Sequence, residues 1–170
     1  MSKAITVRRA RTSDVPDVRR LLDAYVRDRI LLDKAMVTLY ESIQEFWVAE
    51  RDDDNAEVVG CGALHVMWED LAEVRTLAVK PGLKGYGVGH QLLEKLLDTA
   101  RWLGVRRVFC LTFEVDFFGK HGFVEIGETP VDTDVYAELL RSYDEGVAEF
   151  LGLERVKPNT LGNSRMLLHL

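Results

Sequence analysis

The chain is poor in the residues that mark specialised small folds, with 2 cysteines and 4 prolines among 170 residues. Cys61 and Cys110 lie in apolar runs and have no CxxC spacing, so the sequence predicts reduced core thiols and no zinc site. Low-complexity and collagen-like classes are excluded because 47% of the residues are hydrophobic and 29% are charged.

A surplus of positive charge is also missing, since 22 Lys and Arg against 28 Asp and Glu give a net charge of −6. Nucleic-acid-binding proteins normally present a basic face, so we expect no nucleic-acid partner. No apolar run is long enough to span a bilayer, and the first residues lack the apolar core of a signal peptide. The sequence therefore predicts a cytoplasmic globular protein that does not associate with membranes.

Hydrophobic periodicity predicts one mixed α/β domain over residues 1–170. Apolar residues at three- and four-residue spacing predict an amphipathic helix after Pro16 and a second long helix after Val88. Strands are expected at 4–8, 46–50, 58–66, 73–79, 107–112, 123–126 and 166–170. Further helices are expected at 38–44, 115–121 and 132–145. The strands between 46 and 79 form an antiparallel meander in this interpretation.

A glycine-rich loop, Lys84-Gly85-Tyr86-Gly87-Val88-Gly89-His90, separates an expected strand from an expected helix. Glycines let a backbone approach a ligand closely, and a helix N-terminus offers unpaired N–H groups, so the loop suits a pyrophosphate. The loop lacks the GxxxxGK[ST] pattern of a P-loop. It also lacks the last glycine of a dinucleotide fingerprint.

The residues on both sides of the loop make the prediction of its function more specific. Leu77-Ala78-Val79-Lys80-Pro81 and the loop together resemble the acetyl-CoA signature Q/R-x-x-G-x-G/A of the GCN5-related N-acetyltransferases (GNAT), with Lys84 in the Q/R position. Downstream, Phe117-Phe118-Gly119-Lys120-His121-Gly122-Phe123 resembles the F-Y-x-x-x-G-F segment of the same family, with Phe118 in place of the tyrosine.

The resemblance implies the α/β GNAT fold, a mixed and mostly antiparallel central sheet that is flanked by helices and splayed at two parallel strands. These strands would end at Val79 and Thr112. The resemblance also implies acetyl-CoA as co-substrate and no metal. The residues it assigns to coenzyme binding are Leu77, Ala78, Val79, Lys84, Gly85, Tyr86, Gly87, Val88, Gly89, His90 and Phe118.

Acetyl transfer to an amine requires deprotonation of the ammonium group, stabilisation of the oxyanion and departure of the thiolate. Glu73 is the candidate base, because similar enzymes carry a glutamate at the start of the splayed strand. A backbone N–H near Leu77 would bind the oxyanion. With Phe118 at the tyrosine position, Thr112 is the candidate donor to the leaving thiolate.

Several other segments resemble N-acetylglutamate synthases, above all their short stand-alone actinobacterial form. The segments that show this resemblance are residues 30–34, 59–64, 73–79, 109–112 and the tail 156–168. This resemblance implies L-glutamate, or alternatively L-glutamine, as acceptor and a place in arginine biosynthesis. A dicarboxylic substrate needs cationic donors, and the candidates are Lys34, Arg75 and Arg165. A homodimer is expected because two-fold assemblies are the commonest.

Two other functions remain open at the level of sequence. The chain could be a GNAT acetyltransferase for another amine, such as a protein N-terminus or a polyamine. It could instead be a non-catalytic acyl-CoA-binding regulatory module. Replacing Glu73 with Ala distinguishes an enzyme, which would lose turnover and keep acetyl-CoA binding, from a binding module, which would change little.

Overall fold

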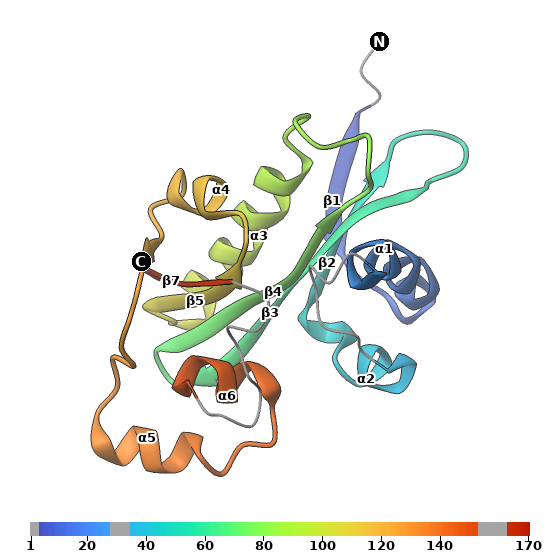
Figure 1. Cartoon of the computed structure of the whole chain (residues 1–170). Coiled ribbons are helices and arrows are strands. Elements are labelled where there is room, and N and C mark those ends of the chain that lie inside the picture. Colours follow the sequence, from blue (N-terminus) through green and yellow to red (C-terminus); the bar gives the residue numbers. More distant parts are fainter. Residues whose placement is uncertain (1–3, 28–34, 153–162) are drawn as a thin grey trace. The chain divides into compact units, whose positions relative to one another are not determined.

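A computed structural model describes residues 4–27, 35–152 and 163–170 (Figure 1). The strands are β1 (Ile5–Arg9), β2 (Phe46–Arg51), β3 (Val58–Trp68), β4 (Leu71–Val79), β5 (Arg107–Thr112), β6 (Val124–Glu125) and β7 (Ser164–His169). The α-helices are α1 (Val15–Arg27), α2 (Met36–Glu41), α3 (Val88–Leu103), α4 (Val115–Gly119), α5 (Thr133–Leu139) and α6 (Glu145–Leu151). Short 3₁₀ turns are η1 (Thr12–Asp14) and η2 (Ile43–Glu45).

The strands form a seven-stranded sheet in the order β1-β2-β3-β4-β5-β7-β6. The pairs β1–β2, β2–β3, β5–β7 and β6–β7 are antiparallel, whereas β4 and β5 are parallel. The prediction of a mixed, mostly antiparallel sheet flanked by helices is therefore confirmed.

The parallel pairing is short. It joins Leu71, Ala72 and Glu73 of β4 to residues 107–109 of β5, while β5 pairs with β7 over its whole length. The start of the parallel pair is anchored by Asp70, whose carbonyl accepts the N–H groups of Arg106 and Arg107. The Asp70 carboxylate also lies 3.3 Å from the Arg107 guanidinium. Within the described residues the recorded pairing thus ends at Glu73, where the predicted splay begins.

The chain forms two compact units. Unit 1 comprises Met1–His65 and Val74–Trp102, and unit 2 comprises Val66–Glu73 and Leu103–Leu170. Strand β4 contributes Leu71–Glu73 to unit 2 and its remaining residues to unit 1. Whether the two units behave as the single domain expected from the sequence stays a prediction.

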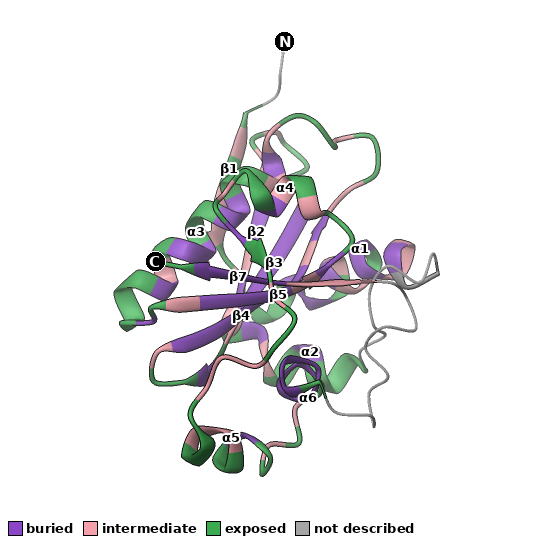
Figure 2. Ribbon diagram, turned by 60° about the vertical axis from the view of Figure 1, so that its left-hand side comes forward, coloured by how far each residue is buried: buried purple, intermediate pink, exposed green. Residues whose placement is uncertain are grey.

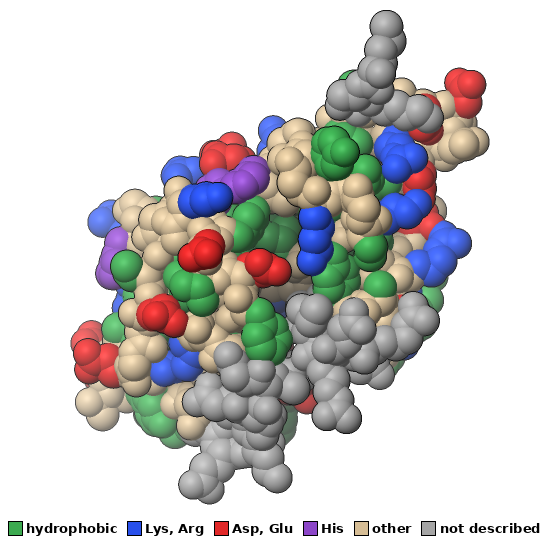
Figure 3. Space-filling model, turned by 45° about the horizontal axis from the view of Figure 1, so that its top comes forward, with side chains coloured by type: hydrophobic (Ala, Val, Ile, Leu, Met, Phe, Trp, Pro, Cys, Tyr) green, Lys and Arg blue, Asp and Glu red, His purple; other side chains and the backbone are tan. Residues whose placement is uncertain are grey.

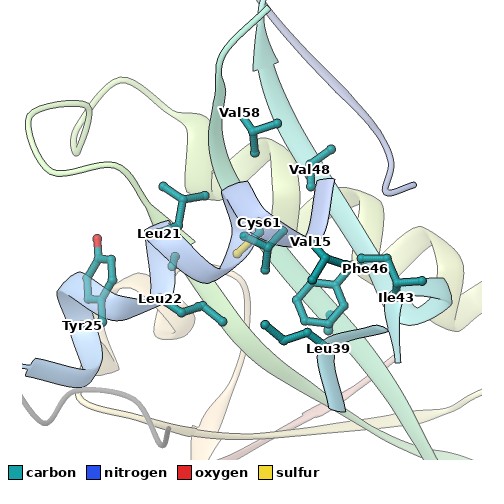
Figure 4. Packing of buried hydrophobic residues seen from close by; sticks show 13 residues of the cluster. Val15, Leu21, Leu22, Tyr25, Leu39, Ile43, Phe46, Val48, Val58 and Cys61 are labelled. Atoms are coloured by element: carbon teal, nitrogen blue, oxygen red, sulfur yellow. The ribbon is translucent and has the colours of Figure 1, made fainter. Parts of the chain in front are cut away.

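Alternation along β2 gives unit 1 a core on each face of its strands. Phe46 and Val48 pack against α1 and α2, together with Cys61 of β3 (Figure 4). Ala49 lies on the opposite face with Val88 and Leu92 of α3. The further buried residues of α3 are Leu93, Leu96, Leu97 and Ala100. Figure 2 shows the buried positions along one side of this helix, as the three- and four-residue spacing predicted.

Unit 2 has its own core, in which Phe109 of β5 and Phe150 of α6 pack edge to face with centroids 5.2 Å apart. The single helix expected at 132–145 is wrong, because α5 ends at Leu139 and a separate helix, α6, begins at Glu145. The Asp144 carboxylate caps α6 by accepting the Val147 N–H at 3.0 Å. This local cap competes with continuation of the preceding helix.

The described part of the chain contains no helix long and apolar enough to cross a membrane. Acidic and basic side chains are mixed over the face drawn in Figure 3. Among the described residues there is no group of three or more His, Cys, Asp or Glu side chains placed to hold a metal ion.

Candidate active site

The glycine-rich loop of unit 1 connects the end of β4 to the start of α3. Gly85 and Gly87 have φ angles of +87° and +81°, a conformation that glycine adopts without steric cost. A Cβ at either position would meet nothing within 4 Å, so both glycines are needed for their backbone angles. The first helical hydrogen bond of α3 runs from Gln91 N–H to Gly87 O. The N–H groups of Val88 and Gly89 precede it and form the helix end that suits an anion.

The last strand residues before this loop, Leu77 to Val79, are among those that the family resemblance assigns to coenzyme binding. Lys80 N–H donates to Val59 O on β3, so alternation directs the polar groups of Val79 and Leu77 away from β3. The Val79 carbonyl accepts a hydrogen bond from the Tyr25 hydroxyl of α1. A carbonyl has two lone pairs, so this bond leaves one for a ligand amide.

Tyr25 is a residue that sequence reasoning placed only in the apolar stripe of the first helix. The Lys84 ammonium lies over its ring, 5.2 Å from the centroid. Tyr25 therefore contacts both the end of β4 and the first residue of the loop. Only the tyrosine hydroxyl, at the end of an otherwise apolar stripe, was a signal for this role.

In unit 2, the candidate base Glu73 is 5% exposed and pairs with Phe109 in the parallel ladder. Its carboxylate lies close enough to Cys110 to affect that thiol. Burial first, and then the negative charge of Glu73, raise the pKa of Cys110 well above its ordinary value. Glu73 is thus a carboxylate in a water-poor environment, fixed two residues from the anchored start of the strand pair.

Thr112 and Phe118, the other unit 2 residues predicted from the motifs, are both buried. The Thr112 hydroxyl oxygen accepts the Glu114 N–H at 2.8 Å, which leaves the hydroxyl proton for another acceptor. Phe118 packs edge to face against Phe117 and Phe123. Their roles in thiolate departure and coenzyme binding stay predictions.

Of the three predicted acceptor-binding cations, Arg165 is the most informative. It lies on β7 opposite Leu111, and its Nη2 donates to the Phe150 carbonyl at the end of α6. The guanidinium also sits over the Phe109 ring, 5.9 Å from the centroid. Burial lowers the pKa of Arg165, and its Nε is buried with no hydrogen-bond partner in the described part of the chain.

The other two cations are less well defined. Arg75 is half-buried on β4 in unit 1, and Lys34 lies outside the described residues. A residue that sequence reasoning missed is Asn163, just before β7. Its Oδ1 is buried and has no hydrogen-bond partner among the described residues. Its sequence signal was the polar Asn163-Ser164-Arg165 segment, which is unsuitable for a core.

The sheet order and the strand–loop–helix site define a coenzyme A-dependent acyltransferase, and the comparisons agree. Residues 42–125 match the family described as "Acetyltransferase (GNAT) domain". An amino-acid acetyltransferase of Mycobacterium tuberculosis is 61% identical over 162 residues, which cover 95% of this chain and 92% of the relative. The chain therefore belongs to the GNAT acetyltransferases, which use acetyl-CoA as co-substrate.

More distant relatives extend the comparison. The amino-acid acetyltransferase of Neisseria meningitidis serogroup B is 32% identical over 126 residues, covering 73% of this chain and 28% of that protein. A crystal structure of a Mycobacterium tuberculosis protein with CoA and the ligand NLQ superimposes with a TM-score of 0.92, covering 97% and 99% of the two chains at 61% identity. N-acetylglutamate synthase from Neisseria gonorrhoeae, complexed with coenzyme A and N-acetyl-glutamate, shares the fold with a TM-score of 0.77 at 23% identity. The match covers 100% of this chain and 36% of that one.

Proposed function

We propose that this enzyme transfers the acetyl group of acetyl-CoA to the α-amino group of L-glutamate, with L-glutamine as an alternative acceptor. The product would be N-acetylglutamate, which enters arginine biosynthesis. The relatives named amino-acid acetyltransferases support an amino-acid acceptor. The single observation that carries the choice of a carboxylate-bearing acceptor is the environment of Arg165.

A half-buried guanidinium without a carboxylate partner is costly, because desolvation disfavours the charged form. None of the described acidic side chains forms an ion pair with Arg165, and its recorded contacts are a carbonyl and an aromatic ring. The unpaired Nε therefore favours an anionic ligand. A substrate carboxylate would supply the missing charge and accept from the rigid guanidinium fork.

Asn163 provides a second unsatisfied group two residues from Arg165, and alternate residues of an extended segment share one face. A side-chain amide presents one acceptor and one donor group. The unsatisfied atom of Asn163 is the acceptor Oδ1, which can accept a hydrogen bond from the side-chain amide of glutamine. Asn163 therefore supports L-glutamine as an alternative acceptor.

The proposed reaction assigns one step to each candidate residue. Glu73 accepts a proton from the substrate ammonium, directly or through water, and the neutral amine attacks the thioester carbonyl. The Leu77 N–H stabilises the resulting oxyanion. The C–S bond then breaks and the new amide bond remains. The second proton lost by the attacking nitrogen passes to the departing thiolate, with the Thr112 hydroxyl as the donor that relays it. A thiol with a pKa of about 8.5 leaves without strong acid assistance.

The proposal also includes a cytoplasmic homodimer built from single-domain chains. Closed two-fold assemblies are the commonest oligomers, which supports the dimer. Light scattering coupled to size-exclusion chromatography would measure the mass in solution, and a mass of one chain would contradict this part of the proposal.

The test is thiol release from acetyl-CoA in the presence of L-glutamate, L-glutamine, L-aspartate, L-arginine, L-lysine or a polyamine. Turnover confined to glutamate and glutamine is the expected result. Turnover with another amine alone would assign the enzyme to a different acceptor. Measurable acetyl-CoA binding without turnover on any acceptor would overturn the proposal in favour of an acyl-CoA-binding module.

A further inference from the structure

Strand β4 contains a backbone kink at Thr76. The φ angle of this residue is +58°, and Thr76 is only 7% exposed. A β-branched residue in this left-handed region is a strained outlier. Its hydroxyl is also buried with no hydrogen-bond partner in the described chain. Such a kink persists only where neighbouring groups hold it.

The neighbouring group on one face is the Cys61 thiol of β3. Its Sγ donates to the Thr76 carbonyl at 3.5 Å and accepts the N–H of Ala78. Cys61 is completely buried, and burial raises the pKa of its thiol to about 12, so it remains a protonated donor at neutral pH. The sulfur therefore holds the backbone on both sides of Leu77.

Figure 4 shows Cys61 among residues of α1 and β2, on the face of β3 that α1 covers. On the opposite face, Gly62 leaves room for Leu77. A Cβ at Gly62 would lie 2.9 Å from Leu77 Cδ1 and 3.0 Å from Leu96 Cδ1, so these side-chain ends would have to shift to admit one. Strand β3 thus contacts the Leu77 segment through the Cys61 thiol on one face and through Gly62, which has no side chain, on the other.

We propose that Cys61 is a positioning residue for acetyl transfer. Its thiol holds the Thr76 kink so that the Leu77 N–H points to the thioester oxygen. This inference rests on the proposed role of Leu77 in the oxyanion site. It concerns a buried cysteine that sequence reasoning treated as core packing alone.

The first test compares Cys61→Ala with Cys61→Ser, since serine keeps both a donor and an acceptor. Removal of an oxyanion donor typically costs 100- to 1,000-fold in kcat, so a misdirected Leu77 N–H should lower kcat by about tenfold or more. We expect this loss in Cys61→Ala, with the Kd of CoA changed less than about twofold, and recovery of most of kcat in Cys61→Ser. A purely structural role would not produce this separation.

The matched control is Val48→Ala, which removes buried volume from the same core cluster on the next strand. It should lower the unfolding midpoint as Cys61→Ala does while leaving kcat unchanged. Equal kcat values for Cys61→Ala and Val48→Ala would overturn the proposal. So would a Cys61→Ser variant as slow as Cys61→Ala.

A second measurement does not depend on the amine acceptor. The amide resonance of Leu77 should differ between CoA and acetyl-CoA complexes in the unmodified protein, because only acetyl-CoA carries the thioester oxygen. This difference should disappear in Cys61→Ala and return in Cys61→Ser. An unchanged difference in Cys61→Ala would refute the positioning role, whereas failure of glutamate acetylation alone would refute only the proposed acceptor.

Discussion

Unit 1 buries Arg8 beside two carboxylates, whereas unit 2 buries Arg165 beside a carbonyl and an aromatic ring. The Arg8 guanidinium lies 2.8 Å from Asp14 and 2.6 Å from Glu50, and the hydrogen bond to Asp14 is the main factor that raises its pKa. Burial instead lowers the pKa of Arg165. The first arginine completes an ion pair inside the fold, whereas the second has a buried Nε without a hydrogen-bond partner among the described residues.

A similar contrast separates the candidate residues within each unit. Those of unit 1 are mainly backbone groups of strand β4, the glycine loop and the first turn of α3. The candidates for acceptor binding and chemistry in unit 2 are side chains, namely Glu73, Thr112, Asn163 and Arg165. Backbone groups suit a coenzyme that must be bound by its pyrophosphate and amides, while side chains can distinguish one amino acid from another.

The largest expected effect is a loss of kcat on replacement of Glu73, the candidate base of unit 2. Replacing Glu73 with Gln removes the candidate base and should lower kcat by about 100- to 10,000-fold. The Kd of CoA should remain unchanged, because Glu73 is not among the residues predicted to bind the coenzyme. Steady-state kinetics and calorimetric CoA binding would measure both quantities. Glu125→Gln, an exposed carboxylate of β6, is the control, and full activity in Glu73→Gln would exclude the base role.

A smaller effect is expected on acceptor recognition. Arg165→Met should lower kcat/KM for the amino acid by about 100-fold, mostly through KM, because one charged partner of a buried pair is lost. KM for acetyl-CoA should be unaffected. The exposed Arg141 of unit 2, changed to Met, controls for the loss of an arginine. Equal effects on the two KM values would contradict the assignment of Arg165 to the acceptor.

The ion pair of unit 1 should affect stability rather than specificity. The hydrogen bond from Arg8 lowers the pKa of Asp14 in the folded state below its ordinary value of 3.8. Asp14 therefore contributes stability above that value and loses the contribution as pH falls through its folded pKa. Urea unfolding at pH 7 should show Asp14→Asn destabilised by about 2 kcal/mol, since the pair is only partly buried.

The difference between Asp14→Asn and the unmodified protein should shrink as the pH falls below about 4, because the carboxyl is protonated first in the unfolded state and only at lower pH in the folded state. Asp98→Asn, at an exposed pair with Arg101, should change the free energy of unfolding by less than about 1 kcal/mol. A pH-independent difference for Asp14→Asn would show that packing, not charge, is responsible.

The smallest effect concerns the backbone of the coenzyme loop. Gly87→Ala forces an L-residue into a left-handed conformation and should weaken CoA binding about tenfold, because the strain amounts to about 1–2 kcal/mol. Gly127→Ala is the matched control, since Gly127 also has open space around a Cβ and no left-handed φ angle is recorded for it. Calorimetry with CoA would compare the two variants. An unchanged CoA affinity in Gly87→Ala would show that the left-handed conformation at Gly87 is not needed for coenzyme binding.

Local patterns explain what could be predicted. The apolar spacing of α3, the glycines before it and the alternation of the strands each depend on a few neighbouring residues, and these elements were confirmed. The prediction missed the break between α5 and α6 because the second helix begins at a local hydrogen bond, from the Val147 N–H to the Asp144 carboxylate. Arg165 was predicted as a candidate from its sequence segment. Only the packing of α6 and β5 around it shows that its contacts are a carbonyl and an aromatic ring and not a described carboxylate.

The sequence by itself determined most of the elements, the mixed sheet and the motifs that identify the family, because these depend on periodicity and on residues close in the chain. Only the tertiary structure decided which polar groups are satisfied and which are not. Tyr25 meets Val79 across 54 positions, and Cys61 meets Thr76 across 15. Such contacts follow from strand pairing and helix packing rather than from local pattern.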